Sequence, residues 1–297
     1  MQPARSRARR EALFGYAMIA LSLVVVFVFT AAPIVGSFVL ALFKWDAISS
    51  PQFIGLDNFE ALLQDKTITH SLLVTAGLAV MIVFLQVALG LWLALLVARR
   101  ASAIVRNLFR AAFFLPMLAS AASISIVMTY VFNDHFGVIN YYLGALHLPT
   151  VPWLSSAGGA TATIVLVAVW QQLGFTFILF VAALGSLPQD VLEAAQIDGA
   201  SSARLFRQIK LPLISPTVLF ACTVGLINTM QLFDQPYVMT KGGPGEATYT
   251  TVLVVYQTAF QNLQFGYASA MSVLLFAVLL VITAVQFTVS RKWVFYS

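Results

Sequence analysis

The chain has 297 residues, of which 60% are apolar and only 9% are charged, and its mean hydropathy is +0.91. A soluble domain of ordinary composition has about 25% charged residues, so these few charges cannot cover a soluble globule. The composition excludes a soluble enzyme, a secreted disulfide scaffold and a disordered chain, and it indicates a protein dissolved mainly in the lipid bilayer. The single cysteine, Cys222, permits no disulfide within the chain.

Six segments are long and apolar enough to cross a membrane as helices, which takes about 20 residues each. Pro116 lies near the start of the third one. The connections 44–70 and 133–159 read as loops, and residues 1–297 are expected to form a single transmembrane domain. In chain order the expected spans are residues 14–43, 71–98, 111–133, 160–185, 211–235 and 266–290.

The basic residues orient the six spans, because cytoplasmic loops of membrane proteins carry an excess of Lys and Arg. With the N-terminus inside, thirteen of the sixteen basic residues fall in cytoplasmic segments, and only Lys44, Lys66 and Lys241 fall outside. We therefore expect both termini in the cytoplasm. The first span, residues 14–43, is too long for a secretory signal and is expected to be an uncleaved signal anchor.

The chain lacks motifs by which a protein supplies its own chemical or ionic energy. No segment reads GxxxxGK[ST], so no phosphate-binding loop is expected. The three histidines are far apart, which argues against a metal site, and no catalytic cluster of a membrane enzyme is visible. No expected span contains Lys or Arg, and Asp234 lies only at the edge of one, which argues against an ion-coupled carrier. The chain is expected to be no enzyme and to bind no cofactor itself.

The most informative segment is the connection between the fourth and fifth spans, residues 186–215. A proline and an early acid favour a short helix, and Gly199 is placed to end that helix in a left-handed turn. Ser201 or Ser202 can cap a second helix that leads into the fifth span. Glu193 stands among alanines, which would let another surface approach the backbone closely. A helical hairpin lying along the lipid interface is the alternative interpretation.

The spacing of this segment resembles the EAA loop of the membrane subunits of binding-protein-dependent ABC importers. The match extends over 20 positions without a gap and comprises Glu193, Ala194, Ala195, Asp198, Gly199, Ile209, Leu211 and Pro212. The resemblance implies an all-α integral membrane protein with the type I ABC importer permease fold. It also implies that these eight residues couple the chain to an ATPase subunit.

A second resemblance narrows the class to the carbohydrate-type permeases. It rests on residues 233–244, which include Gly242-Gly243-Pro244, and on Gly55-Leu-Asp-Asn-Phe59. The family implies a second, similar permease, two ATPase subunits that hold ATP and Mg²⁺, and an extracytoplasmic solute-binding protein. It implies a bacterial or archaeal cytoplasmic membrane, and no nucleic-acid partner. Disaccharides, oligosaccharides, polyols and glycerol phosphodiesters remain open as substrates.

Polar residues inside the expected spans are candidates for the solute pathway, because such residues usually face the interior of a helix bundle. Amides and hydroxyls beside aromatic rings suit the binding of a sugar. The candidates are Trp170, Gln171, Gln172, Gly174, Phe177, Asn228, Gln231, Asp234 and Ser272. For each of them the alternative is interhelical hydrogen bonding, worth about 0.6 kcal/mol on average in membranes. The alternative function is a stand-alone channel or secondary transporter, which would need no ATPase.

Overall fold

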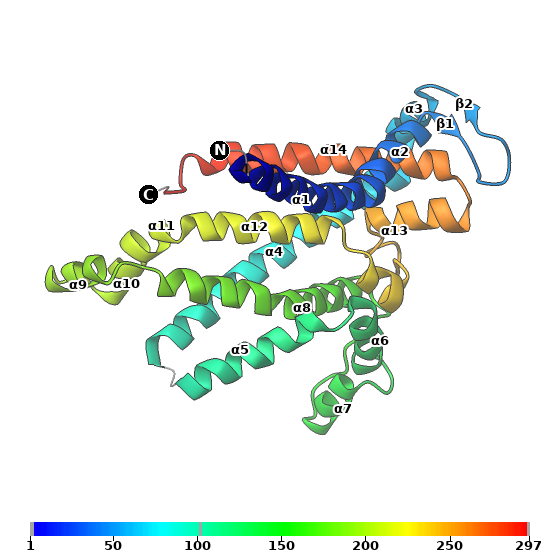
Figure 1. Cartoon of the computed structure of the whole chain (residues 1–297). Helices are drawn as coiled ribbons and strands as arrows, with labels where there is room; N and C mark the ends of the chain where they lie inside the picture. The colour runs from blue at the N-terminus through cyan, green and yellow to red at the C-terminus, as the bar shows by residue number, and fades with distance from the viewer. Residues whose placement is uncertain (1–2, 101–102, 296–297) are drawn as a thin grey trace. The chain divides into compact units, whose positions relative to one another are not determined.

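The computed structural model describes residues 3–100 and 103–295, and the side chains of residues 13–97 and 111–295. The described chain is almost entirely helical, with one short antiparallel hairpin (Figure 1). Its elements are α1 Pro3–Val26, η1 Phe27–Ala31, α2 Ala32–Leu40, β1 Phe43–Lys44, β2 Gln52–Phe53, α3 Asp57–Gln64, α4 Lys66–Arg100, α5 Ala103–Leu118, α6 Ala121–Val131, α7 Val138–Ala145, α8 Ala157–Gly185, α9 Gln189–Ile197, α10 Ser202–Leu205, η2 Phe206–Lys210, α11 Leu211–Leu213, α12 Ser215–Met230, η3 Pro236–Thr240, α13 Thr251–Tyr256, η4 Gln257–Gln261 and α14 Phe265–Ser290. The segments written η are single turns of π-helix.

The arginines near the N-terminus and those between the second and third expected spans contribute most of the charge bias that orients the chain. They lie outside the described side chains. The prediction that both termini are cytoplasmic therefore stays a prediction. The residues concerned are Arg5, Arg7, Arg9, Arg10, Arg99, Arg100, Arg106 and Arg110.

Four helices among the described residues are long and apolar enough to cross a membrane unbroken. They are Leu13–Leu40, Lys66–Val97, Ala157–Gly185 and Phe265–Ser290, which correspond to the first, second, fourth and sixth expected spans. The third and fifth expected spans are present only as bent helix pairs. Ala111–Leu118 meets Ala121–Val131 at 108°, and Ser202–Leu213 meets Ser215–Met230 at 65°. Six spans result only if each bent pair is one span.

The bend in the third expected span lies just after the end of α5. Pro116 lies inside α5, where its missing N–H and its ring affect the turn that precedes it, whereas the break follows it. The helix ends two residues later, at Leu118, and Ser120 takes an extended conformation with φ −58° and ψ 134° before α6 begins. An apolar run that reads as continuous in the sequence is therefore two helices.

The chain divides into two compact units. The first unit holds the residues up to Asp65 together with Val255–Leu275, and the second holds Lys66–Val254 together with the residues from Phe276 onward. Each unit is described separately.

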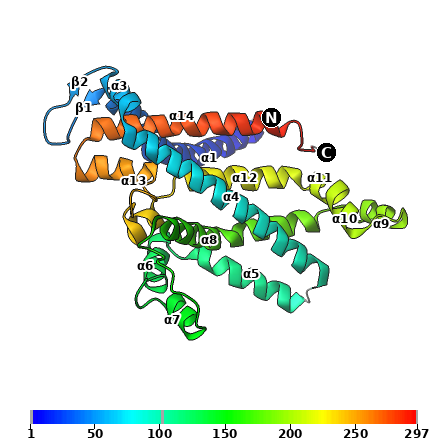
Figure 2. The same ribbon diagram turned by 180° about the vertical axis from the view of Figure 1, so that it is seen from behind.

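In the second unit, α8 is the central helix and packs against α4, α5 and α12, as the two opposite views agree (Figures 1 and 2). Small residues allow the helices to approach closely, as is common in membranes. A Cβ at Gly174 of α8 would collide with the carbonyl oxygen of Phe113 in α5, and a Cβ at Gly90 of α4 would lie 2.8 Å from the Thr176 methyl carbon of α8. The fully buried Phe177 and Phe180 fill the space beside these contacts.

In the first unit, the connection that reads as a loop between the first two spans is partly ordered into regular structure. Strands β1 and β2 pair antiparallel, with Lys44 opposite Gln52, and α3 follows. The buried Asn58 of α3 donates through its Nδ2 to the carbonyl oxygens of Ala41 (2.8 Å) and Phe43 (3.0 Å). This side chain thereby ties α3 to the start of the hairpin.

The connection at 133–159 in the second unit also contains a helix, α7, which the sequence reading did not expect. Asn140 anchors it and is 5% exposed. Its Nδ2 donates to the carbonyl oxygens of Asp134 and Val151, both at 2.9 Å, and its Oδ1 accepts from the Trp153 indole at 3.1 Å. The amide thus joins both ends of the connection.

Candidate functional site

The loop at 186–215 folds into two short helices joined by a turn at Gly199, as its sequence predicts, and is called the helical hairpin below. Helix α9 ends in a Schellman motif, in which the Gly199 N–H donates to the Gln196 carbonyl (3.0 Å) and the Ala200 N–H donates to the Ala195 carbonyl (2.9 Å). Gly199 has φ +76°, so the expected left-handed turn is confirmed. Apart from its two chain neighbours, no described residue has a heavy atom within 4 Å of where its Cβ would be, so the requirement for glycine is torsional and not steric crowding.

The second arm of the hairpin begins at Ser201. The Ser201 hydroxyl oxygen accepts from the Arg204 N–H at 3.4 Å, and the Ser201 carbonyl accepts from the Leu205 N–H at 2.8 Å. Of the two serines proposed as the cap, Ser201 is therefore the one that serves. The arm continues through η2 and α11 into α12, which places Ile209, Leu211 and Pro212 half-buried at its base.

The hairpin has a buried side and an exposed side. Its buried side is a cluster of Leu187, Leu192, Leu205 and Ile214, against which Ala195 and Ile209 also pack. Its exposed side carries Glu193, Ala194, Asp198 and Gly199. The tip residue Ile197 is 86% exposed. The exposed side therefore combines carboxylates, a small residue and one projecting apolar side chain.

Within the second unit, this hairpin lies at the end of α8 away from α6 and α7. Both views place α9 and α10 beyond the C-terminal end of α8, whereas α6 and α7 lie near its N-terminal end (Figures 1 and 2). Since α8 is long enough to cross a membrane, the two regions occupy opposite ends of a candidate span.

The polar candidates of α8 have different environments. Trp170 is 39% exposed. The Gln171 Oε1 accepts a hydrogen bond from the Gln235 Nε2 at 2.8 Å, which links α8 to the segment just after α12. The Gln172 Oε1 is buried and has no hydrogen-bond partner among the residues that the structure describes.

Two other candidates on α8 are committed to packing within the chain. Gly174 is the point of closest approach to Phe113, and the fully buried Phe177 has its ring centroid 5.9 Å from that of Phe113. In this conformation neither residue can contact a solute unless α5 moves. Their apolar and small character serves helix packing here.

The remaining candidates do not form one cluster. Asn228 and Gln231, at the end of α12, are exposed, and Asp234 is half-buried. Ser272 belongs to the other unit, where its hydroxyl donates to the Ala268 carbonyl of its own helix at 2.9 Å. The structure brings Gln171 to Gln235, and none of the predicted residues lines the pocket at the β1–β2 hairpin, the apolar pocket between α4 and α8 or the pocket beside α9 and α10.

One polar contact between helices was not predicted. Gln86 of α4 is 1% exposed and donates through its Nε2 to the Thr176 hydroxyl oxygen of α8 at 2.7 Å. Its Oε1 has no hydrogen-bond partner among the described residues. A Cβ placed on Gly225 of α12 would lie 3.5 Å from this oxygen. The signal was the lone glutamine in an apolar span, but nothing in the sequence identifies its partner.

Buried threonines fix the segment that follows η3. Thr248, Thr250 and Thr251 are at most 1% exposed. The Thr251 N–H donates to the Thr75 hydroxyl oxygen at 2.9 Å, and the Thr250 hydroxyl donates to the Leu232 carbonyl at 2.9 Å. These bonds hold the segment against α4 and the end of α12. The glycine-rich turn that precedes it, with Gly242 at φ +89°, is joined to it by the Thr248 hydroxyl, which donates to the Gly243 carbonyl at 2.9 Å.

Comparison with known proteins gives concordant matches. Residues 86–294 match the family model described as "Binding-protein-dependent transport system inner membrane component". The chain is 32% identical over 284 residues to the probable starch degradation products transport system permease protein AmyD of Thermoanaerobacterium thermosulfurigenes, covering 95% of this chain and 96% of that protein. It is 35% identical over 285 residues to the trehalose/maltose transport system permease protein MalF of Thermococcus litoralis, covering 95% of each.

A solved structure shares the fold. It is one chain of a bacterial alginate ABC transporter in complex with an alginate pentasaccharide-bound periplasmic protein. The TM-score is 0.83 at 23% identity, over 97% of this chain and 96% of that one.

Proposed function

The chain belongs to the inner-membrane components of binding-protein-dependent transport systems, and from this premise we propose that it forms half of the translocation pathway of an ATP-driven sugar importer. A multi-pass membrane subunit of an importer follows from the family. The proposal adds the energy source, the solute class and the residues that serve them. The observation that carries it is the rigid helical hairpin at 186–215 with its exposed carboxylates.

The hairpin is suited to transmit force from an ATPase subunit. Its buried cluster and its Schellman turn hold α9 as a rigid body, while Glu193, Ala194 and Asp198 remain exposed on the other side. The small Ala194 permits close approach, and Glu193 offers a charge to a basic partner. Closure of an ATPase dimer would displace α9 and rock the attached spans between two arrangements, as in other domain motions of this kind. ATP and Mg²⁺ belong to the ATPase subunits in this proposal.

A saccharide is the solute class best supported. The relatives named above are transporters of starch degradation products and of trehalose and maltose, and the alginate transporter imports a polysaccharide. The exposed amides of Asn228 and Gln231 can exchange hydrogen bonds with hydroxyl groups. None of the six spans expected from the sequence contains Lys or Arg, so none of them offers a cation to bind a phosphate deep in this chain. We extend the proposal to a second permease and an extracytoplasmic binding protein, since the alginate transporter was solved with its periplasmic protein.

Reconstitution tests the proposal. The chain is assembled in liposomes with its partner permease and ATPase subunits, and uptake of labelled oligosaccharide is measured. We expect uptake that needs both ATP and the binding protein. Uptake by this chain alone, without ATP, would instead identify a stand-alone channel or secondary transporter.

A further inference from the structure

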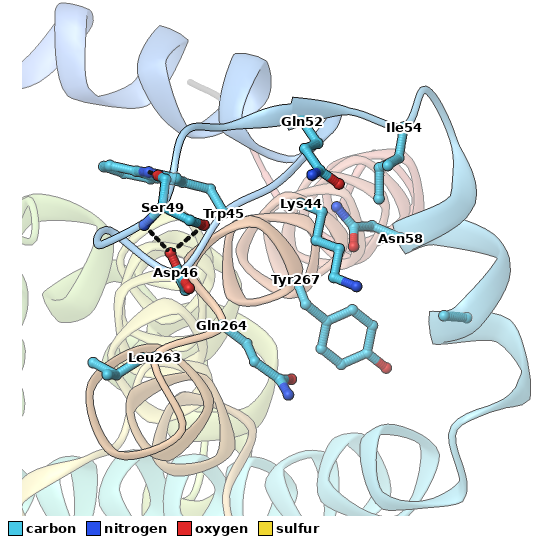
Figure 3. A pocket seen from close by; sticks show the side chains of 11 residues that line it. Lys44, Trp45, Asp46, Ser49, Gln52, Ile54, Asn58, Leu263, Gln264 and Tyr267 are labelled. Atoms are coloured by element: carbon cyan, nitrogen blue, oxygen red, sulfur yellow. Dashed lines mark hydrogen bonds between the residues drawn. The ribbon is translucent and has the colours of Figure 1, made fainter.

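The first unit contains a pocket that none of the residues proposed above for ATPase coupling or solute passage lines. Its volume is about 520 Å³, within the range of about 300–1,000 Å³ typical of small-molecule sites. The β1–β2 hairpin, α3 and the start of α14 together form its walls (Figure 3). The side chains that matter for its chemistry are Lys44, Trp45, Gln52, Asn58, Gln264 and Tyr267.

The floor of the pocket is held rigidly. A Cβ at Gly266 would collide with the Phe43 carbonyl oxygen, so α14 and the hairpin touch at the backbone. The Gly266 N–H donates to the Trp45 carbonyl at 3.3 Å, and the Trp45 indole donates to the Ser49 carbonyl at 3.0 Å. With the Asn58 bonds already described, the walls are fixed before any ligand arrives, which lowers the entropic cost of binding.

The polar groups in the pocket are available to a ligand. Within the part of the chain that the structure describes, no hydrogen bond engages the Lys44 ammonium or the side-chain amides of Gln52 and Gln264. Figure 3 shows these three groups around one space, beside the ring of Tyr267. An amide both donates and accepts, as a sugar hydroxyl does, and an aromatic ring provides an apolar face.

The charges of the pocket favour a neutral ligand. Lys44 is accompanied by Asp46, whose carboxylate Oδ1 accepts from the Ser49 N–H and hydroxyl (both 2.7 Å) and from the Ile48 N–H (3.0 Å). These bonds lower the pKa of Asp46 to about 2, so it stays charged at neutral pH. A second carboxylate, Asp65, accepts from the Tyr267 hydroxyl at 2.8 Å. The charge of Lys44 is therefore balanced by these carboxylates, so an anionic ligand would gain little electrostatic attraction in the pocket.

We propose that this pocket is a binding site for neutral saccharide, separate from the pathway residues on α8 and α12. The proposal rests on the proposed function for its ligand class, since the pocket itself selects a neutral, hydroxyl-rich molecule. A subsite of this kind would hold part of an oligosaccharide that approaches the membrane.

Cysteine protection tests the pocket at one position. Ala61 lines the pocket and is exposed, so Ala61→Cys in a Cys222→Ser background places a single thiol in its wall. The assembled transporter, without ATP or binding protein, is alkylated with a small neutral maleimide. We expect maltotriose to slow alkylation at least threefold in a saturable way, and trigalacturonate to protect less.

Two further variants locate the effect. Gln52→Ala and Gln264→Ala, introduced together into the Ala61→Cys protein, remove two side-chain amides, each of which should contribute about fivefold to saccharide affinity. Half-maximal protection of the thiol should therefore need about 25-fold more maltotriose. Gln261→Ala is the matched control, because Gln261 is an exposed glutamine of the same connection that does not line the pocket. It should leave protection unchanged.

The outcomes separate this inference from the proposed function. If ATP-driven uptake proceeds but no saccharide protects the thiol, the pocket is not a saccharide site and the importer assignment stands. Protection by ligand-free binding protein alone would mark a protein contact and would likewise contradict the inference. Saturable protection in a complex that shows no ATP-driven uptake would support the pocket while contradicting the proposed function.

Discussion

Gly199 has the most specific backbone requirement in the exposed hairpin. Its φ of +76° is strained for any residue with a Cβ, and a β-branched side chain there is a genuine outlier. We expect Gly199→Val to open the turn after α9, at a cost above about 1–2 kcal/mol, and to reduce ATP-driven uptake at least tenfold. The complex should still assemble, because the cluster beneath the hairpin is untouched. Uptake and co-purified subunits are measured on the same preparation.

The matched control is Gly185→Val. Gly185 is also exposed and its Cβ would also meet no atom within 4 Å, but its backbone is helical. Gly185→Val should lose far less ATP-driven uptake than Gly199→Val. Equal uptake by the wild type and Gly199→Val would remove α9 from the coupling step.

Thr176 offers a second test at this scale, on the unpredicted contact with Gln86. Thr176→Val keeps the shape of the side chain but removes the acceptor of the 2.7 Å bond from the Gln86 Nε2. Leaving this buried amide unpaired should cost about 1 kcal/mol, which lowers the melting temperature by about 2–4 °C. Thermal unfolding in detergent, followed by tryptophan fluorescence, measures the change.

Thr176→Ser is the comparison that isolates the hydrogen bond. It keeps the hydroxyl and loses the methyl group that packs against Gly90. If the serine variant melts lower than the valine variant, packing at Gly90 and not the hydrogen bond stabilises this contact.

Residue environments could be predicted from the sequence only where local geometry decides them. The turn at Gly199 was identifiable, and the cap was narrowed to Ser201 or Ser202, because a left-handed turn and a helix cap depend on near neighbours. The burial of Phe177 and the pairing of Gln86 with Thr176 depend on which faces of three helices meet. In spans that are apolar all round, hydrophobic periodicity does not carry that information.

At the scale of elements, α9 depends on the cluster beneath it. Leu192 is 8% exposed and packs with Leu205 and Ile214, whereas its neighbour Val191 is 44% exposed. We expect Leu192→Ala to cost about 2–4 kcal/mol locally and to speed tryptic cleavage at the exposed Arg204 and Arg207. Cleavage is followed by mass spectrometry of the intact complex.

Val191→Ala provides the control for this effect. It removes a similar apolar side chain one position away but from the exposed face, so tryptic cleavage should stay at the wild-type rate. Equal acceleration by both variants would show that the cluster does not hold the hairpin.

The elements themselves were predictable to different degrees. Long apolar runs gave the four unbroken helices because a span needs about 20 apolar residues whatever its neighbours. The bend at Ser120 was not predicted, since hydropathy does not report where a proline ends a helix and where it only kinks one. The β1–β2 hairpin and α7 were also missed. Asn58 and Asn140 stabilise them through backbone carbonyls that are distant in sequence.

At the scale of the whole molecule, the 108° bend between α5 and α6 decides the topology. If this pair and the bent pair Ser202–Leu213 and Ser215–Met230 each cross the membrane, the charge bias is satisfied and the termini share one side. If the α5–α6 pair is instead a re-entrant loop, both of its ends lie on one side and every later segment is inverted. The alternatives differ in the sides of two exposed residues, Thr150 and Ser202, whereas the exposed Gln64 precedes the pair and serves as the reference.

Single cysteines at these positions distinguish the two topologies. Gln64→Cys, Thr150→Cys and Ser202→Cys, each in a Cys222→Ser background, are labelled in intact cells with a membrane-impermeant maleimide, with permeabilised cells as the reference for total reactivity. Lys66–Val97 and Ala157–Gly185 are each long and apolar enough to cross once. A spanning pair therefore puts positions 64 and 150 on the outer side and 202 inside. A re-entrant pair would put 64 and 202 together and 150 opposite, which would place the hairpin on the side away from ATP and exclude its coupling role.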